Sequence, residues 1–188
     1  ARFMGESGYF VTYEQVDPLF SVDLSDPEKP KILGKLKIPG FSEYLHFYGE
    51  DRLLGIGMST DEESGVAEGV KITMFDISDR SDVKEESTLV LDDLYGSHAA
   101  YDYKSVLADP EKNVIGLSGY SQNGESYYLL TYNRTDRKFE TILQEEVNGN
   151  TSQGIRGIYI EDTLYVISGN IIEAYDMNTG VKSGDIIL

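Results

Sequence analysis

The two histidines, His46 and His98, are the side chains best suited to acid–base chemistry or to metal binding. Each lies in a segment that leads into a predicted β-strand. No carboxylate stands near either one at the spacing of a metal site, so the pattern favours structural histidines held by hydrogen bonds. The segments Gly57–Ser59 and Gly116–Ser118 lack the second glycine of a nucleophile elbow. The sequence therefore predicts no catalytic residue.

Other reactive or ligand-binding motifs are equally sparse. The chain contains no cysteine, which excludes disulfides, thiolate nucleophiles and thiolate metal sites. The most calcium-like stretch, Asp61–Gly65, is acidic but lacks the alternating oxygen ligands and the closing glutamate of an EF-hand loop. We expect a solvated loop there. We expect no cofactor and no metal site, with a bound divalent cation as the one alternative.

Three segments rich in Tyr, His, Ser and Arg precede predicted inner strands and carry the candidate ligand-binding residues. These segments are 41–46, 95–101 and 150–156. In a repeat architecture they would share one face, where such side chains suit contact with a peptide or a glycan. Ordinary packing between repeats is the alternative. The candidate binding residues are Tyr44, His46, His98, Tyr101 and Arg156.

A turn motif that recurs four times shows the organisation that positions these residues. Its acidic or amide member stands at Asp23, Asp76, Asn133 and Asp176, at intervals of 53, 57 and 43 residues. Such intervals match the blades of a β-propeller with loop insertions. We expect each of these side chains to accept backbone N–H hydrogen bonds and so to fix the turn into an outer strand.

Each repeat contains the sequence pattern of four strands. A short apolar run, such as 9–12 or 164–167, precedes the turn motif, and a more polar, alternating strand follows it. An inner strand, predicted over 2–4, 46–48, 103–107 and 157–160, opens each repeat. We therefore predict an all-β protein: a β-propeller or propeller segment with four blades of four antiparallel strands. The approximate blades are 1–40, 41–95, 96–149 and 150–188 in a single propeller region.

Composition excludes several classes of partner. The formal net charge is −17, from 33 acidic and 16 basic residues. A surface that binds nucleic acid needs clustered Lys and Arg, so nucleic acid is excluded as a partner, and an anionic membrane is disfavoured for the same reason. No apolar run reaches the roughly 18 residues of a transmembrane helix, so we expect no membrane insertion. The acidity most simply favours solubility.

The opening run Ala1–Gly5, the segments 11–20, 22–27 and 36–42, and the later segments 71–79 and 101–104 resemble a known family. It is the family of secreted bacterial and archaeal proteins with a C-terminal β-propeller domain, distantly similar to WD-40 repeats. The resemblance implies a secreted or cell-surface location, with any signal peptide outside this sequence. Since the propeller region of that family is considerably longer, the resemblance also implies that this sequence is a C-terminal fragment of a longer protein. It brings no catalytic residues. The third repeat departs from the pattern, with Asn133-Arg134 in place of an Asp-apolar pair.

Three functions are compatible with these features. The first is a non-catalytic extracellular module that binds a protein or glycan through the loop face. The second is a hydrolase or lyase with its site at the central channel, and the third is a metal-stabilised structural domain. Four blades could close as a compact ring, or form part of a larger ring that upstream blades or a second copy in a homodimer would complete. The resemblance favours the larger ring.

Overall fold

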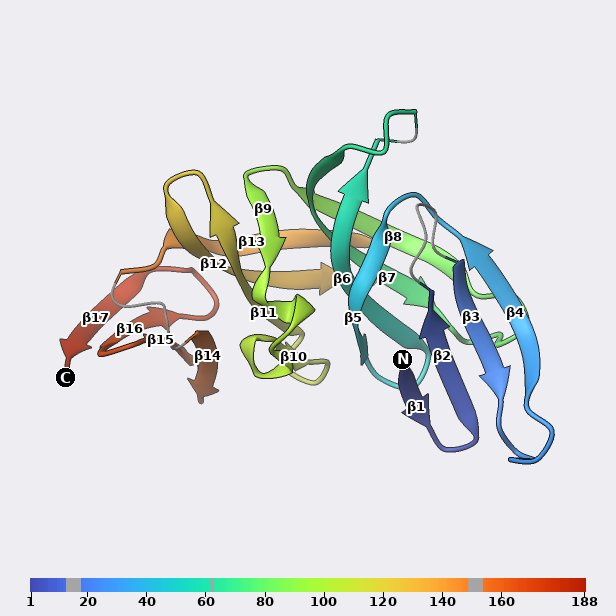
Figure 1. Ribbon diagram of the computed structural model, residues 1–188. Coiled ribbons are helices and arrows are strands. Elements are labelled where there is room, and N and C mark those ends of the chain that lie inside the picture. Colours follow the sequence, from blue (N-terminus) through green and yellow to red (C-terminus); the bar gives the residue numbers. More distant parts are fainter. Residues whose placement is uncertain (13–17, 62, 149–153) are drawn as a thin grey trace. The chain divides into compact units, whose positions relative to one another are not determined.

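The computed structural model describes residues 1–12, 18–61, 63–148 and 154–188, and it is built from antiparallel β-sheets (Figure 1). Its strands form four antiparallel sheets, each with a path of four hydrogen-bonded strands in sequence order, and the third sheet has a short fifth strand off that path. The prediction of an all-β protein with four four-stranded repeats is confirmed. Within the described ranges no helix is long and apolar enough to cross a membrane.

The chain divides into two compact units, 1–92 and 93–188, and unit 1 contains the first two sheets. The first sheet consists of β1 (Arg2–Met4), β2 (Ser7–Val11), β3 (Pro18–Asp23) and β4 (Lys31–Lys37). The second consists of β5 (Phe41–Phe47), β6 (Arg52–Thr60), β7 (Ala67–Asp76) and β8 (Lys84–Leu91).

Unit 2 contains the third and fourth sheets. The third consists of β9 (Leu94–Ser97), β10 (Leu107–Asp109), β11 (Val114–Ser121), β12 (Gly124–Asn133) and β13 (Lys138–Glu146). The fourth consists of β14 (Ile155–Ile160), β15 (Thr163–Ser168), β16 (Ile171–Asp176) and β17 (Lys182–Ile187). Two short 3-10 turns, η1 (His98–Ala100) and η2 (Tyr103–Ser105), lie between β9 and β10.

The repeated Asp or Asn has the predicted structural role in every repeat. The Oδ1 atom of each accepts a hydrogen bond from the backbone N–H two residues later, at 2.9 Å for Asp23 and Asp76 and at 3.0 Å for Asn133 and Asp176. Hydrogen bonds from the hydroxyl and the N–H of Ser78 hold the pKa of Asp76 below its usual value. These Asx turns connect the third strand of each sheet to its fourth.

Neighbouring sheets within each unit bury apolar side chains between them. In unit 1, Tyr9 and Leu19 of the first sheet form one core with Leu53, Phe75 and Ile77 of the second. In such a sheet, successive side chains alternate between its two faces, so the residues that pack together recur at every second position. Full burial of one large apolar side chain contributes about 1.5–3 kcal/mol. The contact between sheets is therefore a principal source of stability in each unit.

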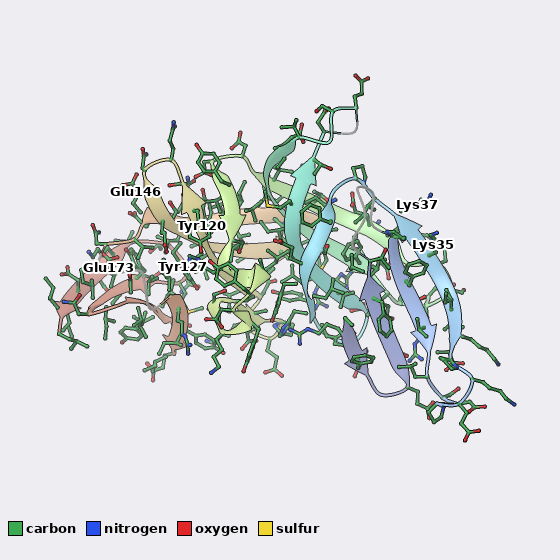
Figure 2. All side chains as sticks on the ribbon, in the orientation of Figure 1. Lys35, Lys37, Tyr120, Tyr127, Glu146 and Glu173 are labelled. Carbon is green, nitrogen blue, oxygen red and sulfur yellow. The ribbon has the colours of Figure 1, made fainter. Side chains whose placement is uncertain are left out.

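Unit 2 repeats this arrangement. Tyr127 and Leu129 of the third sheet share a core with Leu164, Val166 and Tyr175 of the fourth. Tyr127, labelled in Figure 2, is completely buried, and burial raises the pKa of its hydroxyl. A Cβ atom at Gly157 would lie 1.7 Å from the Tyr127 hydroxyl oxygen. Glycine at position 157 thus allows β14 to approach this ring.

The segment 41–46, predicted as a loop before the second inner strand, is itself strand in the structure. β5 runs from Phe41 to Phe47 and pairs with β6 along its length, with one bulge near Ser42 and Tyr44. Gly57 on β6 explains why this pairing is possible, because a Cβ atom there would lie 1.9 Å from the carbonyl oxygen of Phe41. The prediction of a loop was wrong, because it did not consider that Gly57 lets the backbone of β5 approach β6 closely.

Candidate functional site

The inner strand of the third sheet is interrupted by residues 98–106, which we call the excursion. Before the interruption, Ser97 of β9 pairs with Gly119 of β11; after it, Leu107 of β10 pairs with Gly116. Only Leu117 and Ser118 separate those two glycines on β11, so nine residues of the inner strand are inserted opposite a two-residue gap. The insertion moves the excursion out of the hydrogen-bonding ladder of the sheet.

Local hydrogen bonds determine the shape of the excursion. The Ser97 hydroxyl donates to the backbone carbonyl of Ser118 at 3.1 Å and accepts from the N–H of Ala99 at 3.1 Å, which caps η1. Asp102 caps η2 by accepting the N–H of Lys104 at 3.0 Å. Capping residues of these types stabilise short helical turns. The inner strand predicted over 103–107 is therefore wrong for 103–106: residues 103–105 form η2 and β10 begins only at Leu107.

His98 anchors the excursion to the sheet. Its side chain is buried, with its Nδ1 atom 3.0 Å from the Ser118 hydroxyl and its Nε2 atom 3.3 Å from Glu125 Oε2. The His98 ring also lies 4.5 Å from the ring of Tyr120, between centroids. The imidazole thus replaces part of the contact that a continuous inner strand would make with β11.

A serine, a histidine and a glutamate in contact have the composition of a hydrolytic triad, but their arrangement differs from one. In a Ser-His-Asp triad the nucleophile contacts Nε2 and the carboxylate contacts Nδ1. Here Ser118 contacts Nδ1 and Glu125 lies near Nε2. Ser118 is also completely buried, so its hydroxyl is not available to a substrate. The arrangement is a buried polar network that supports the excursion.

Around this buried anchor lies a set of accessible side chains that we call the tyrosine rim: Tyr101, Asp102, Tyr103, Tyr120 and Arg156. Tyr101 is 66% exposed and Tyr103 is 64% exposed. The Nη2 atom of Arg156, from β14, lies 3.9 Å from Asp102 Oδ2. Tyr120, labelled in Figure 2, contributes the ring beside His98. Burial, followed by the charge of Glu125, raises the pKa of Tyr120.

Tyr44 and His46 form a separate pair in unit 1. The Tyr44 hydroxyl is 2.9 Å from His46 Nδ1, and the guanidinium of Arg2 lies 4.8 Å from the centre of the Tyr44 ring. Burial, together with the nearby charge of Arg2, lowers the pKa of His46. Tyr44 itself is buried. This pair belongs to the packing between the first and second sheets, which was the alternative weighed for these segments.

Of the five predicted residues, Tyr44 and His46 contact each other in unit 1. In unit 2, His98 contacts Tyr101, and Arg156 lies beside the neighbouring Asp102. The part 150–153 of the third predicted segment lies outside the described residues. The sequence reasoning missed Asp102, Tyr103 and Tyr120. Asp102 could have been recognised, because Asp side chains commonly accept the backbone N–H two residues later and so mark a turn.

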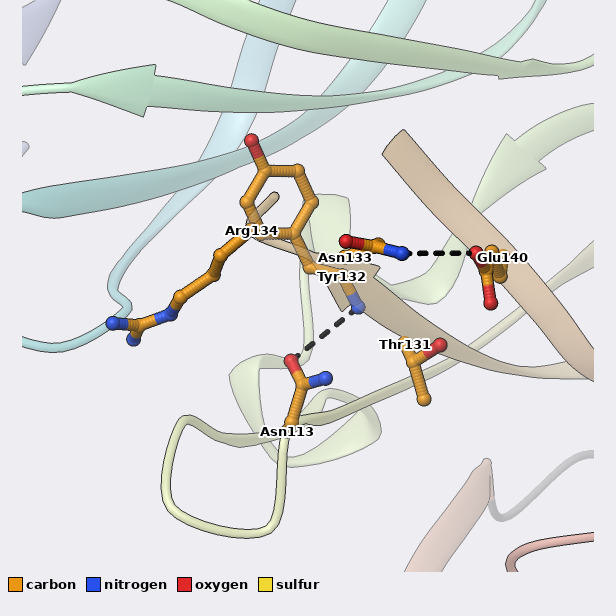
Figure 3. A pocket seen from close by; sticks show the side chains of 6 residues that line it. All are labelled: Asn113, Thr131, Tyr132, Asn133, Arg134 and Glu140. Carbon is orange, nitrogen blue, oxygen red and sulfur yellow. Dashed lines mark hydrogen bonds between the residues drawn. The ribbon is translucent and has the colours of Figure 1, made fainter. Parts of the chain in front are cut away.

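A polar pocket of about 430 Å³ lies elsewhere in unit 2, beside the turn that follows β12 (Figure 3). Asn113 Oδ1 accepts the backbone N–H of Tyr132 there at 3.3 Å, and Asn133 Nδ2 lies 3.5 Å from Glu140 Oε1. The unusual Arg134 of the third repeat also lines it. Across the described ranges, no three His, Cys, Asp or Glu side chains are grouped so that they could hold a metal ion.

Comparison with known proteins identifies the family. A family model described as "Beta propeller domain" matches residues 1–180, so the chain belongs to the β-propeller domain family. An uncharacterized protein of Archaeoglobus fulgidus is 40% identical over 187 residues, which cover 100% of this chain and 27% of that protein. An uncharacterized protein of Methanocaldococcus jannaschii is 34% identical over 177 residues, which cover 94% of this chain and 26% of that protein. The chain thus spans about a quarter of the curated relatives it matches.

Solved structures agree on the fold. Sqt1 of Saccharomyces cerevisiae matches 92% of this chain and 44% of its own, with a TM-score of 0.60 and 15% identity. A Bacteroides uniformis protein, whose name proposes a 6-phosphogluconolactonase, matches 91% of this chain and 49% of its own, with a TM-score of 0.59 and 14% identity. At these identities the likeness establishes the fold alone.

Proposed function

We propose that this chain is part of a non-catalytic, extracellular or cell-surface binding module that holds a protein or glycan ligand through the tyrosine rim. The observation that carries the proposal is the pair of largely exposed rings, Tyr101 and Tyr103, on a segment anchored by the buried His98. Tyrosine offers a large, rigid and amphipathic contact surface at a low cost in side-chain entropy, and Tyr and Arg are enriched among the residues that dominate binding energy.

The capping hydrogen bonds of the excursion also favour a preorganised binding surface. Both of its 3-10 turns are capped by side chains, and Asp102 uses one oxygen to cap η2 while the other faces Arg156. A preorganised surface loses little conformational entropy on association, which favours affinity. The overall charge of −17 favours neutral or basic ligands over acidic ones. An extracellular location is proposed on the family resemblance described for the sequence.

Catalysis is the second candidate, and the contact between Ser118, His98 and Glu125 is the specific observation that could favour it. Its order around the imidazole and the burial of Ser118 argue for a structural network instead. A Ser118→Ala variant distinguishes the two, because a hydrolase would lose its activity on a chromogenic ester or lactone panel. A binding module would show no Ser118-dependent turnover on that panel.

The binding proposal is tested on arrays of oligosaccharides and of unmodified peptides, with the labelled 188-residue chain as the probe. We expect saturable binding to a subset of spots, and loss of that binding in the double variant Tyr101→Ala/Tyr103→Ala. Tyr95→Ala is the matched control, because Tyr95 is 63% exposed but lies on β9, outside the excursion. Binding that is equal in all three proteins, or absent from both arrays, would contradict the proposal.

A further inference from the structure

The fourth sheet has apolar side chains on both faces, but the described strands of unit 2 cover only one. Leu164, Val166 and Tyr175 face the third sheet and are buried in the shared core. The opposite face, which we call the distal face, carries the cross-strand pairs Ile158 with Tyr165 and Ile172 with Ile186, together with Ile167. Ile158 is 48% exposed and Ile186 is 59% exposed.

A sheet face that is meant for water alternates polar residues with the buried apolar ones of its other side. The distal face instead has isoleucines and a tyrosine on consecutive strands, and such contiguous apolar patches mark interaction surfaces. A shallow groove of about 230 Å³ runs over it, lined in part by Tyr165, Ile172, Ala174 and Ile186. The strands of the fourth sheet thus have the composition of strands that are covered on both sides.

The internal repeats indicate what covers this face. The comparable residue stands four positions before the turn Asp or Asn in the first, third and fourth repeats. Leu19 and Leu129 occupy this position in the first and third sheets, and both are buried in the core shared with the following sheet. Ile172 occupies it in the fourth sheet and is only half-buried. At this position the first and third sheets each pack against the sheet that follows them. In the fourth sheet no described strand of unit 2 covers the equivalent residue, Ile172.

A second position agrees with this assignment. Tyr165 pairs with Ala174, two residues along from the pair of Thr163 with Asp176. Tyr9 pairs with Ser21 in the same way, two residues along from the pair of Ser7 with Asp23. Tyr9 packs against Phe47 of the second sheet, with 5.8 Å between ring centroids. Tyr165 is thus the fourth sheet's equivalent of a residue that contacts the next sheet.

We propose that the distal face of the fourth sheet seats a further four-stranded propeller blade, supplied by the remainder of a longer polypeptide. Three observations carry this: the open apolar face, the recurrence of its positions in two covered sheets, and the relatives in which the matched region is 27% and 26% of the length. The incoming blade presents apolar side chains just before its own turn residue, as Phe75 and Tyr175 do in the second and fourth sheets.

Because the chain has no cysteine, single cysteines test this assignment cleanly. Ile172→Cys probes the open position, Leu129→Cys the covered equivalent, and Tyr95→Cys an exposed control. The rate of modification by a maleimide is measured for each variant of the 188-residue chain at several protein concentrations. Tyr165→Cys, checked by its thermal melt, replaces Ile172→Cys if that variant does not fold. A cysteine is also placed at the position aligned with Ile172 in the full-length Archaeoglobus fulgidus relative.

We expect Ile172→Cys to react within about threefold of Tyr95→Cys at every concentration, and Leu129→Cys at least about tenfold more slowly. In the full-length relative, the aligned cysteine reacts at least about tenfold more slowly than Ile172→Cys does. Rapid reaction in the full-length relative would overturn the proposal. Protection that grows with concentration would assign the face to a second copy, and protection in a monomer would assign it to unit 1; either result also overturns it.

Discussion

His46 and His98 each lie in a segment that the sequence places before an inner strand, yet the structures around the two residues differ. In unit 1 the inner strand β5 is continuous, and His46 is joined to Tyr44 within the packing between two sheets. In unit 2 the inner strand is interrupted, and His98 anchors an excursion whose tyrosines are exposed. The comparison shows that the segment before or within the inner strand of a repeat can serve packing or surface presentation, depending on whether the strand is continuous.

The largest expected effect tests why β5 is continuous. Gly57→Ala places a Cβ atom 1.9 Å from the carbonyl oxygen of Phe41, a backbone atom that cannot move aside easily. We expect the free energy of unfolding to fall by about 3 kcal/mol, measured by chemical denaturation. Gly184→Ala, where a Cβ atom meets nothing within 4 Å, is the control and should change stability by less than about 0.5 kcal/mol. Equal losses in both variants would contradict the role given to Gly57.

The next effect concerns the anchor. His98→Ala leaves the buried Ser118 hydroxyl without its imidazole partner and opens space beneath the excursion. We expect a loss of about 2 kcal/mol in the free energy of unfolding. His46→Ala removes a less buried ring and should cost about 1–2 kcal/mol. Hydrogen exchange should also quicken in residues 98–106 of His98→Ala. A smaller loss for His98→Ala than for His46→Ala would reverse the comparison.

A third prediction concerns the contribution of His46 to the dependence of stability on pH. The pKa of His46 is lowered from its ordinary 6.5 by burial and by Arg2. Below pH 6.5 the unfolded state therefore binds a proton that the folded state does not, so this residue lowers stability as the pH falls through that range and has no effect above it. His46→Gln should flatten the stability profile between about pH 6.5 and pH 5. An unchanged slope in that variant would show that His46 is not the source.

The smallest expected effect on stability is in the rim. Tyr101→Ala and Tyr103→Ala each remove a ring that is mostly in solvent, so each should change the free energy of unfolding by less than about 0.5 kcal/mol. Thermal melts of both variants measure this. A loss comparable to that of His98→Ala would mean that the rings belong to the framework of the excursion, and the rim would then not be free to bind a ligand.

The repeats and their turns were predictable because they depend on local chemistry. Asp23, Asp76, Asn133 and Asp176 stand at blade-like intervals, and each makes the predicted hydrogen bond. The apolar runs before them also formed the predicted second strands. These features need only the residues within one turn or one strand, so the sequence is enough to identify them.

The excursion and the continuity of β5 were not predictable in the same way. The continuity of β5 depends on Gly57, sixteen residues away from Phe41, and on what a missing Cβ atom permits between strands. The interruption in the third sheet depends on the contact between His98 and Ser118, which are twenty residues apart. Both Tyr44 and Tyr101 precede predicted inner strands in the sequence. Tyr44 is buried because it lies within the paired strand β5, whereas Tyr101 is exposed because it lies in the excursion.

The most direct test of binding through the rim is isothermal titration of an array-identified ligand into the wild-type chain, Tyr101→Ala/Tyr103→Ala and Tyr44→Phe. The difference between the two regions predicts that the dissociation constant of Tyr101→Ala/Tyr103→Ala is at least about tenfold larger than that of the wild type. This corresponds to a loss of about 1.4 kcal/mol of binding free energy. Tyr44→Phe keeps its buried ring and should bind as the wild type does. Unchanged affinity in the rim variant, or an equal loss in Tyr44→Phe, would contradict the assignment of the binding surface to unit 2.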